Sequence, residues 1–180
     1  MRKYLTLWCF VVVFVCLPND AQSQNTTKLI NKALKKAKKE DKKVFVNYFS
    51  TSCDSSEKME SHMKNDAFKT LLESDYVIVN IVVPEDEVSE YVNYSNPMKV
   101  FSGNHSEPMK FPFWKVMDNS GNFVATSVKG DNTNIGYPTT GKDIYRFLEV
   151  LRNTSNFSEA KLNLIANLLQ DSNQKFAYIN

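Results

Sequence analysis

The stretch "KVFVNYFSTSCDSSEKME", residues 43–60, decides how this chain folds. Its first part, residues 43–49, is rich in β-branched and aromatic residues, which predicts a buried strand. Thr51 or Ser52 can cap the helix that the following residues predict. Cys53 therefore stands where a strand ends and a helix begins.

The sequence downstream predicts three more strands. "YVIVNIVV" (76–83) is a nearly continuous apolar run, typical of a strand covered on both faces. "FWKVMDNSGNFVATSV" (113–128) predicts two strands joined by a turn that contains Gly121. The first two strands and the helix between them predict a parallel βαβ unit, and the hairpin must add antiparallel strands to the same sheet.

Helical patterns flank these strands. One helix is predicted from Thr26 or Thr27 to about Lys39, and a short one after Asn65-Asp66. A further helix carries an apolar stripe formed by Ile144, Phe147, Leu148 and Leu151. A final helix within residues 157–170 begins at a Ser158 cap. We therefore expect an α/β domain with a small mixed sheet flanked by helices.

The N-terminal residues have the features of a secretory signal. Met1-Arg2-Lys3 supplies positive charge, an apolar run follows over residues 5–17, and Ala21 and Ser23 fit a cleavage site. We expect a signal peptide at 1–23 and one mature domain at 24–180, because 180 residues suffice for one core. An uncleaved membrane anchor is the alternative.

The cysteine count restricts the chemistry. Cys9 and Cys16 would leave with the signal peptide, so Cys53 remains and no internal disulfide can form. A single thiol in an oxidising compartment is paired with another molecule, buried or reactive.

The charge distribution is asymmetric. Residues 28–43 hold eight lysines against Glu40 and Asp41, whereas from Val44 onward 12 basic residues face 17 acidic ones. The lysines should occupy the solvated face of the first helix, opposite Ile30, Ala33, Leu34 and Ala37. Aromatic residues are absent from this block, so we expect no nucleic-acid partner, and no membrane partner once the signal is cleaved.

The order of elements, Cys53 at the start of a helix and "FPFWKVMDNSGNFV" (111–124) together resemble a protein family. The chain resembles the periplasmic thioredoxin-like domains of bacterial thiol–disulfide interchange proteins over residues 28–152. Residues 84–110 stand out as an insertion with a short helix around 87–94. The resemblance implies a thioredoxin-like fold and a cis-proline at Pro112, with Phe111 and Pro112 lining a groove for the substrate strand.

Three departures from the family pattern concern the site. The family has Cys-x-x-Cys, but the second position here is Ser56. Ser52 replaces the usual Trp, and Asn47 replaces the usual buried Asp. The family carboxylate is thought to deprotonate the second thiol, so without that thiol a buried carboxylate would only be costly to desolvate.

The pattern favours monothiol chemistry. A helix N-terminus favours the thiolate of Cys53, while Asp54 and Glu57 oppose it. We expect Cys53 to be the nucleophile in isomerase-like or reductase-like exchange on protein substrates, with Ser56 as its hydrogen-bond partner. Release of the substrate would need an external thiol donor or a substrate thiol. The expected location is secreted, in the bacterial periplasm.

The rival hypothesis is a redox-inactive protein-binding module. It would use the same groove or the insertion 84–110, with aromatic anchors among Tyr91, Tyr94, Phe101, Phe111, Phe113 and Trp114. The histidines His62 and His105 lack cysteine companions, so we expect no metal site and no cofactor. His62 is predicted to lie on a helix surface. Nothing in the sequence indicates an oligomeric state.

Overall fold

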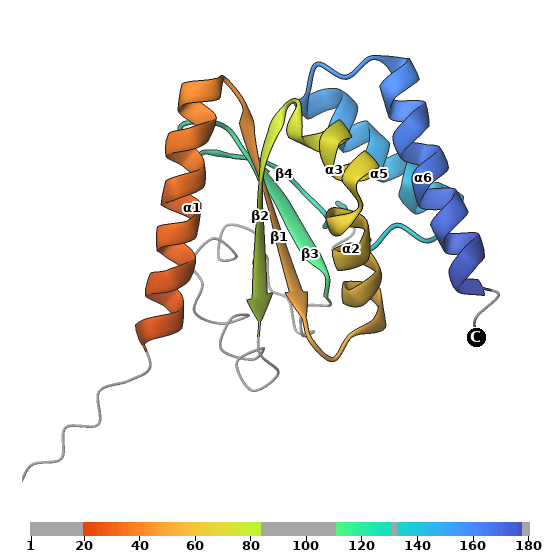
Figure 1. Cartoon of the computed structure of the whole chain (residues 1–180), viewed down its shortest axis with the longest axis horizontal. Coiled ribbons are helices and arrows are strands. Elements are labelled where there is room, and N and C mark those ends of the chain that lie inside the picture. The colour runs from red at the N-terminus through yellow and green to blue at the C-terminus, as the bar shows by residue number, and fades with distance from the viewer. Residues whose placement is uncertain (1–19, 84–110, 131–132, 178–180) are drawn as a thin grey trace, which may run out of the picture.

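A computed structural model of the chain describes residues 20–83, 111–130 and 133–177 (Figure 1). The helices and strands are α1 Asp20–Glu40, β1 Lys43–Ser50, α2 Asp54–Lys64, α3 Asp66–Glu73, β2 Tyr76–Val83, β3 Phe113–Met117, β4 Phe123–Thr126, α5 Gly141–Thr154 and α6 Glu159–Ala177. Residues 1–19 of the predicted signal peptide and the insertion 84–110, with its expected short helix, lie outside the described residues. The predicted cleavage point after Ser23 falls within α1.

The strands form one mixed sheet in the order β2-β1-β3-β4. β1 pairs with β2 in parallel and with β3 in antiparallel, and β3 pairs with β4 in antiparallel. The predicted βαβ unit and hairpin are therefore both confirmed. Asp118 organises the hairpin turn, because its carboxylate accepts backbone N–H bonds from Ser120 and Asn122, and Gly121 adopts a φ of 90° there.

The prediction that β2 is covered on both faces is wrong. Within the described residues β2 is an edge strand that pairs with β1 alone. Val79 and Ile81 are buried on the face that α1 covers, whereas Asn80 and Val82 are exposed on the other face, Val82 by 43%. Since the apolar run is nearly continuous, the sequence does not reveal that one face opens toward the end of the strand.

Helices cover the two faces of the sheet unequally, as Figure 1 shows. On one face α1 packs Ala33 and Ala37 against Val44, Val46 and other buried strand residues. On the opposite face lie α2, α3, α5 and α6. The sheet is thus the middle layer of three, as predicted for helices flanking a mixed sheet.

An aromatic cluster fills the larger of the two cores. Phe45 stacks on Trp114 with ring centroids 5.5 Å apart, and Phe147 of α5 meets Trp114 edge-on at 5.3 Å. All three side chains are fully buried. The predicted stripe on α5 is confirmed, because Ile144, Phe147 and Leu151 are buried and Leu148 is partly buried.

Three predicted helix ends need correction. α1 begins at Asp20 rather than at Thr26 or Thr27, since the residues between contain no helix breaker. The N-cap of α2 is Cys53 itself, so neither Thr51 nor Ser52 caps the helix. α6 continues past the predicted end at Gln170 to Ala177.

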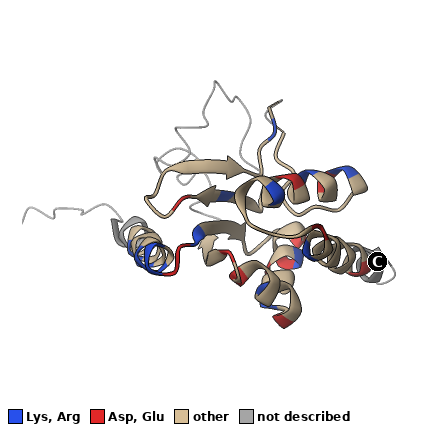
Figure 2. Cartoon of the chain, turned by 90° about the horizontal axis from the view of Figure 1, so that it is seen from above, with Lys and Arg blue, Asp and Glu red and all other residues tan. Residues whose placement is uncertain are grey.

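The lysines of α1 face outward, as predicted (Figure 2). Lys28, Lys32, Lys35, Lys36, Lys38 and Lys39 are all exposed. Glu40, the last residue of α1, forms ion pairs with Lys42 Nζ at 2.9 Å and with Lys36 Nζ at 3.9 Å. No helix among the described residues is long and apolar enough to cross a membrane.

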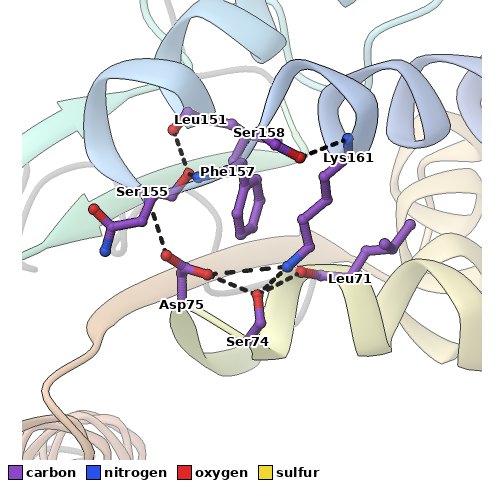
Figure 3. Close-up of polar contacts among 9 residues, drawn as sticks. Leu71, Ser74, Asp75, Leu151, Ser155, Phe157, Ser158 and Lys161 are labelled. Carbon is purple, nitrogen blue, oxygen red and sulfur yellow. Dashed lines mark hydrogen bonds and ion pairs between the residues drawn. The ribbon is translucent and has the colours of Figure 1, made fainter.

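A polar cluster joins the start of β2 to the turn between α5 and α6 (Figure 3). The Asp75 carboxylate accepts hydrogen bonds from the Asn156 backbone N–H at 2.8 Å and from Ser74 Oγ at 2.7 Å. Lys161 of α6 reaches Ser74 Oγ and lies 4.0 Å from Asp75 Oδ2. Its ammonium group also lies 4.3 Å from the centroid of the Phe157 ring. These contacts hold α6 against the domain.

Two further contacts fix α5 at this junction. The Tyr76 hydroxyl and Thr154 Oγ1 form a buried hydrogen bond of 2.6 Å. Arg152 forms a two-bond pair with Glu159 at 2.8 and 2.9 Å on the surface. The end of the sheet opposite Cys53 therefore has a dense set of satisfied polar groups.

Candidate functional site

Cys53 occupies the position that the sequence predicts for it, between the end of β1 and the start of α2. It is half-buried and is the free thiol of the described residues. Its backbone carbonyl accepts N–H bonds from Ser56 at 2.8 Å and Glu57 at 3.0 Å, which begins the helix. Its side chain makes no capping bond to the helix. The thiol thus lies at the positive end of the α2 dipole.

The thiol contacts the segment that precedes β3. Cys53 Sγ donates to the backbone oxygen of Phe111 at 3.3 Å. The Phe111–Pro112 peptide bond is cis, which confirms the expectation for Pro112. Phe111 is half-buried and Pro112 is buried. Residues 58 positions apart in the sequence are therefore brought together around the sulfur atom.

Ser56 lies in the first turn of α2 and is fully buried. Its Oγ accepts a hydrogen bond of 3.2 Å from the backbone N–H of Ser50, the last residue of β1. Among the hydrogen bonds of the described residues, none joins the side chains of Ser56 and Cys53. Ser56 thus ties the end of the strand to the helix and fixes the path of the chain through residues 51–55.

Asn47 lies in β1 beside Trp114 of β3 and is fully buried. Its Nδ2 makes a long bond of 3.5 Å to Asn80 Oδ1, and its own Oδ1 has no hydrogen-bond partner among the described residues. A neutral amide with an unsatisfied oxygen costs free energy when buried, but less than an unpaired carboxylate would. The site therefore has no acid at this position to accept a proton.

The sequence did not identify a third segment of the site, residues 133–138. Asn134 Nδ2 donates to the Pro112 carbonyl at 3.0 Å, and Gly136 N–H donates to Asn134 Oδ1 at 3.0 Å. The indole N–H of Trp114 donates to the Gly136 carbonyl at 2.9 Å. The glycine and Pro138 indicate a loop in the sequence, but no sequence signal shows that this loop contacts Pro112.

The prediction that His62 lies on a helix surface is wrong. His62 is buried where α2, α6 and residue 137 meet, and its ring packs edge-on against Phe68 at 5.1 Å. Tyr137 Oη lies 3.3 Å from Nδ1, and Nε2 lies 3.3 Å from the Leu168 carbonyl. The Lys58 carbonyl oxygen also lies 3.3 Å from Nδ1, so both ring nitrogens have hydrogen-bonding groups within reach.

The Tyr137 side chain that contacts His62 is itself buried. Burial raises the pKa of Tyr137 to about 12, so the hydroxyl keeps its proton at neutral pH. His62 therefore has a packing role that the histidine alone did not indicate, because α6 lies more than 100 residues further along the chain. Among the described residues, no group of three or more His, Cys, Asp or Glu side chains is placed to bind a metal ion.

Lys115 is a second buried group that the sequence did not single out. It lies in β3, and its ammonium nitrogen is 5.6 Å from the centroid of the Tyr48 ring. Within the described part of the chain, Lys115 forms no ion pair. Burial lowers its pKa from 10.5 to about 8.

Comparison with known proteins gives similarity at the level of structure. No protein-family model matches the sequence, and no curated protein sequence matches it. The disulphide isomerase from Xylella fastidiosa Temecula1 is similar in structure, with a TM-score of 0.50 and 20% identity over 78% of this chain and 99% of that one. A DsbH oxidoreductase has a TM-score of 0.46 and 16% identity, over 68% and 81% of the two chains.

The chain has a thioredoxin-like fold. The mixed sheet, the helix that follows β1 and the cis-proline before the hairpin agree with the resemblance found in the sequence. In this thioredoxin-like domain Cys53 and Pro112 lie together at one end of the sheet. α6 is the extra C-terminal helix that the sequence predicted.

Proposed function

We propose that this thioredoxin-like protein is secreted and performs monothiol thiol–disulfide exchange on protein substrates. The observation that carries the proposal is the contact of 3.3 Å between Cys53 Sγ and the carbonyl of Phe111, which precedes the cis-proline. It sets the thiol beside a backbone segment against which a substrate strand can pair. The names of the similar structures, an isomerase and an oxidoreductase, agree with this chemistry.

The reaction has two steps. The Cys53 thiolate attacks one sulfur of a substrate disulfide, a Cys53–substrate bond forms, and the other substrate sulfur leaves as a thiolate that takes up a proton. A second thiolate, from the substrate or from an external thiol, then attacks the mixed disulfide and releases Cys53. Ser56 has no sulfur to perform this second attack, so release depends on the partner.

Each predicted site residue has a role in this proposal. Cys53 is the nucleophile, and Phe111 and Pro112 line the substrate groove. Ser56 acts as a positioning residue through its bond to the Ser50 N–H, which holds the strand end and the helix in place. No step requires a cofactor. The compartment we propose is the bacterial periplasm, since exchange needs substrates with disulfides.

Trapping experiments test the proposal. The full chain is produced in the periplasm of a bacterial host, thiols are blocked with an alkylating agent, and mixed disulfides are sought by non-reducing electrophoresis and mass spectrometry. We expect adducts that disappear on reduction and that Cys53→Ala abolishes. Ser56→Ala should retain them, because it leaves the nucleophile intact.

The same experiment addresses the rival, a redox-inactive binding module. The observation in favour of the rival is that Cys53 is half-buried, because the reactivity of a thiol depends on its exposure. If wild type forms no adducts, and the purified protein reacts with 2-hydroxyethyl 2-pyridyl disulfide no faster than a cysteine peptide does, exchange is ruled out. Partners that both wild type and Cys53→Ala retain would then support the binding module.

A further inference from the structure

The backbone around the cis-proline has an unusual hydrogen-bonding requirement. Pro112 has no N–H to donate, and its carbonyl precedes the first residue of β3, so it lies outside the ladder that begins at Phe113. Pro112 is buried, and a buried carbonyl without a partner is costly. The side-chain amide of Asn134 satisfies it at 3.0 Å.

The amide of Asn134 is itself held in one orientation. Its Nδ2 donates to Pro112, and its Oδ1 accepts from the N–H of Gly136 at 3.0 Å. If the amide were turned over, its oxygen would face the Pro112 carbonyl oxygen and its NH₂ group would face the Gly136 N–H. Both neighbours therefore favour the same orientation of the amide. Asn134 also forms an isolated antiparallel bridge with Val128, which follows β4.

Gly136 brings the loop close to the proline. Its φ of 54° lies in the left-handed region, and a Cβ there would lie 3.2 Å from the Pro112 carbonyl oxygen. The Gly136 carbonyl accepts the buried indole N–H of Trp114. The loop is thus fixed to the core on one side and to Pro112 on the other.

We propose that Asn134, supported by Gly136, is a positioning residue for thiol exchange at Cys53. It holds the Pro112 carbonyl, and through the proline ring and the planar Phe111–Pro112 peptide bond it sets the Phe111 carbonyl at the sulfur atom and along the path of a substrate strand. The inference rests on the proposed function and adds a residue to that site. Its specific consequence concerns substrates with a peptide backbone, because these must align with Phe111 while a small disulfide need not.

Two probes with the same leaving group separate alignment from thiol reactivity. One is an uncharged nonapeptide whose cysteine carries a 2-pyridyl disulfide, and the other is 2-hydroxyethyl 2-pyridyl disulfide. In each reaction the Cys53 thiolate forms a new disulfide and releases pyridine-2-thione, which is followed by absorbance. We expect Asn134→Ala to lower the rate with the peptide between about 10- and 100-fold. The rate with the small probe should stay within about 2-fold.

Two further variants complete the test. Tyr76→Phe removes a buried hydrogen bond at the other end of the sheet and should change neither rate, although it also destabilises the domain. Asn134→Asp keeps the size and the acceptor for Gly136 but removes the donor to Pro112. Asn134→Asp should also lower the rate with the peptide. It serves as the test variant if Asn134→Ala does not fold.

The outcomes separate this inference from the proposed function. A wild-type protein that reacts with neither probe overturns both. A reactive wild type whose Asn134 variants react with the peptide at an unchanged rate overturns the positioning role alone. Equal losses with both probes would also overturn it, because they would indicate lower thiol reactivity rather than poorer alignment.

Discussion

Just before β2, the Asp75 carboxylate accepts hydrogen bonds from Asn156 and Ser74 and lies beside Lys161. Beyond the end of β1, by contrast, the Cys53 thiol makes one hydrogen bond and does not cap α2. The two sites lie at opposite ends of the same sheet. The well-paired end fixes the helices. The poorly paired end leaves a sulfur atom available for chemistry.

Helix caps show the same difference. The side chains of Asn65 and Thr140 accept N–H bonds at the starts of α3 and α5, and Ser158 Oγ accepts the Lys161 N–H at the start of α6. A capping side chain contributes about 1 kcal/mol, which α2 gives up by having Cys53 at its N-cap. Stability is thus lower where the proposed function needs an accessible thiol.

The largest expected effect comes from completing the thiol pair. Ser56→Cys introduces a second sulfur one helical turn from Cys53, so release of a mixed disulfide becomes intramolecular. With dithiothreitol as the reductant, we expect the steady-state rate of insulin reduction to rise by about 100-fold or more over wild type. Cys53→Ala combined with Ser56→Cys is the control and should be inactive. If Ser56→Cys gives no gain, the thiols are not aligned for exchange, and adding Asn47→Asp would test whether the missing acid is the reason.

The second expected effect concerns Lys115, which is buried without an ion pair among the described residues. The pKa of Lys115 is about 8 in the folded chain, below the ordinary lysine value of 10.5. Between these pH values the unfolded chain holds a proton that the folded chain has released, so stability should rise with pH, by at most about 3 kcal/mol. Lys115→Met should abolish this rise and should be more stable than wild type at neutral pH.

Denaturant unfolding of wild type and Lys115→Met between about pH 7.5 and pH 10 measures this effect. The range stops there because burial raises the pKa of Tyr76 and Tyr137 to about 12. Above pH 10 these tyrosines ionise more readily in the unfolded chain and lower the stability. If the free energy of unfolding depends on pH in the same way for both proteins, the Lys115 amine is solvated in the folded state and the expected effect is absent.

The third expected effect is confined to the well-paired end. Asp75→Ala removes the acceptor for the Asn156 N–H and for Ser74, and should lower the free energy of unfolding by about 1 to 2 kcal/mol. The rate of Cys53 with 2-hydroxyethyl 2-pyridyl disulfide should not change. Asp171→Ala in α6 is the matched control, because Asp171 is exposed and forms no ion pair within the described ranges. A change in thiol reactivity with Asp75→Ala would mean that the two ends are coupled.

The smallest expected effect concerns charge near the thiol. Asp54 and Glu57 lie in the first turn of α2 and are both exposed. Replacing both with Asn and Gln should raise the reaction rate of Cys53 with an anionic disulfide by about 3-fold at low salt and lower it with a cationic one. Glu73→Gln in α3 is the control. Equal changes for both disulfides would indicate an effect other than charge.

Much of this architecture follows from local sequence patterns. The spacing of Ile30, Ala33 and Ala37 predicted which side of α1 faces the sheet, and the apolar content of residues 43–49 predicted β1. The hairpin followed from the Gly121 turn. Pro112 as a cis-proline followed from the resemblance to a family, because a proline before a strand has no local signal for its isomer.

The remaining features depend on contacts between distant segments. His62 is buried because Leu168 of α6 and Tyr137 lie against its ring, and no periodicity within α2 shows these contacts. Asn134 reaches Pro112 across the hairpin, so its role is visible only once β3 and β4 are paired. Lys115 occupies a strand position that alternation leaves ambiguous in a short strand, since all but the last residue of β3 are buried.

The contact between Cys53 and Phe111 has a consequence for the order of events during exchange. The sulfur atom lies 3.3 Å from the backbone oxygen of Phe111. A substrate strand that pairs with this backbone segment therefore arrives within reach of the sulfur. We expect backbone pairing to precede attack, so that a peptide disulfide reacts with Cys53 faster than a small disulfide with the same leaving group.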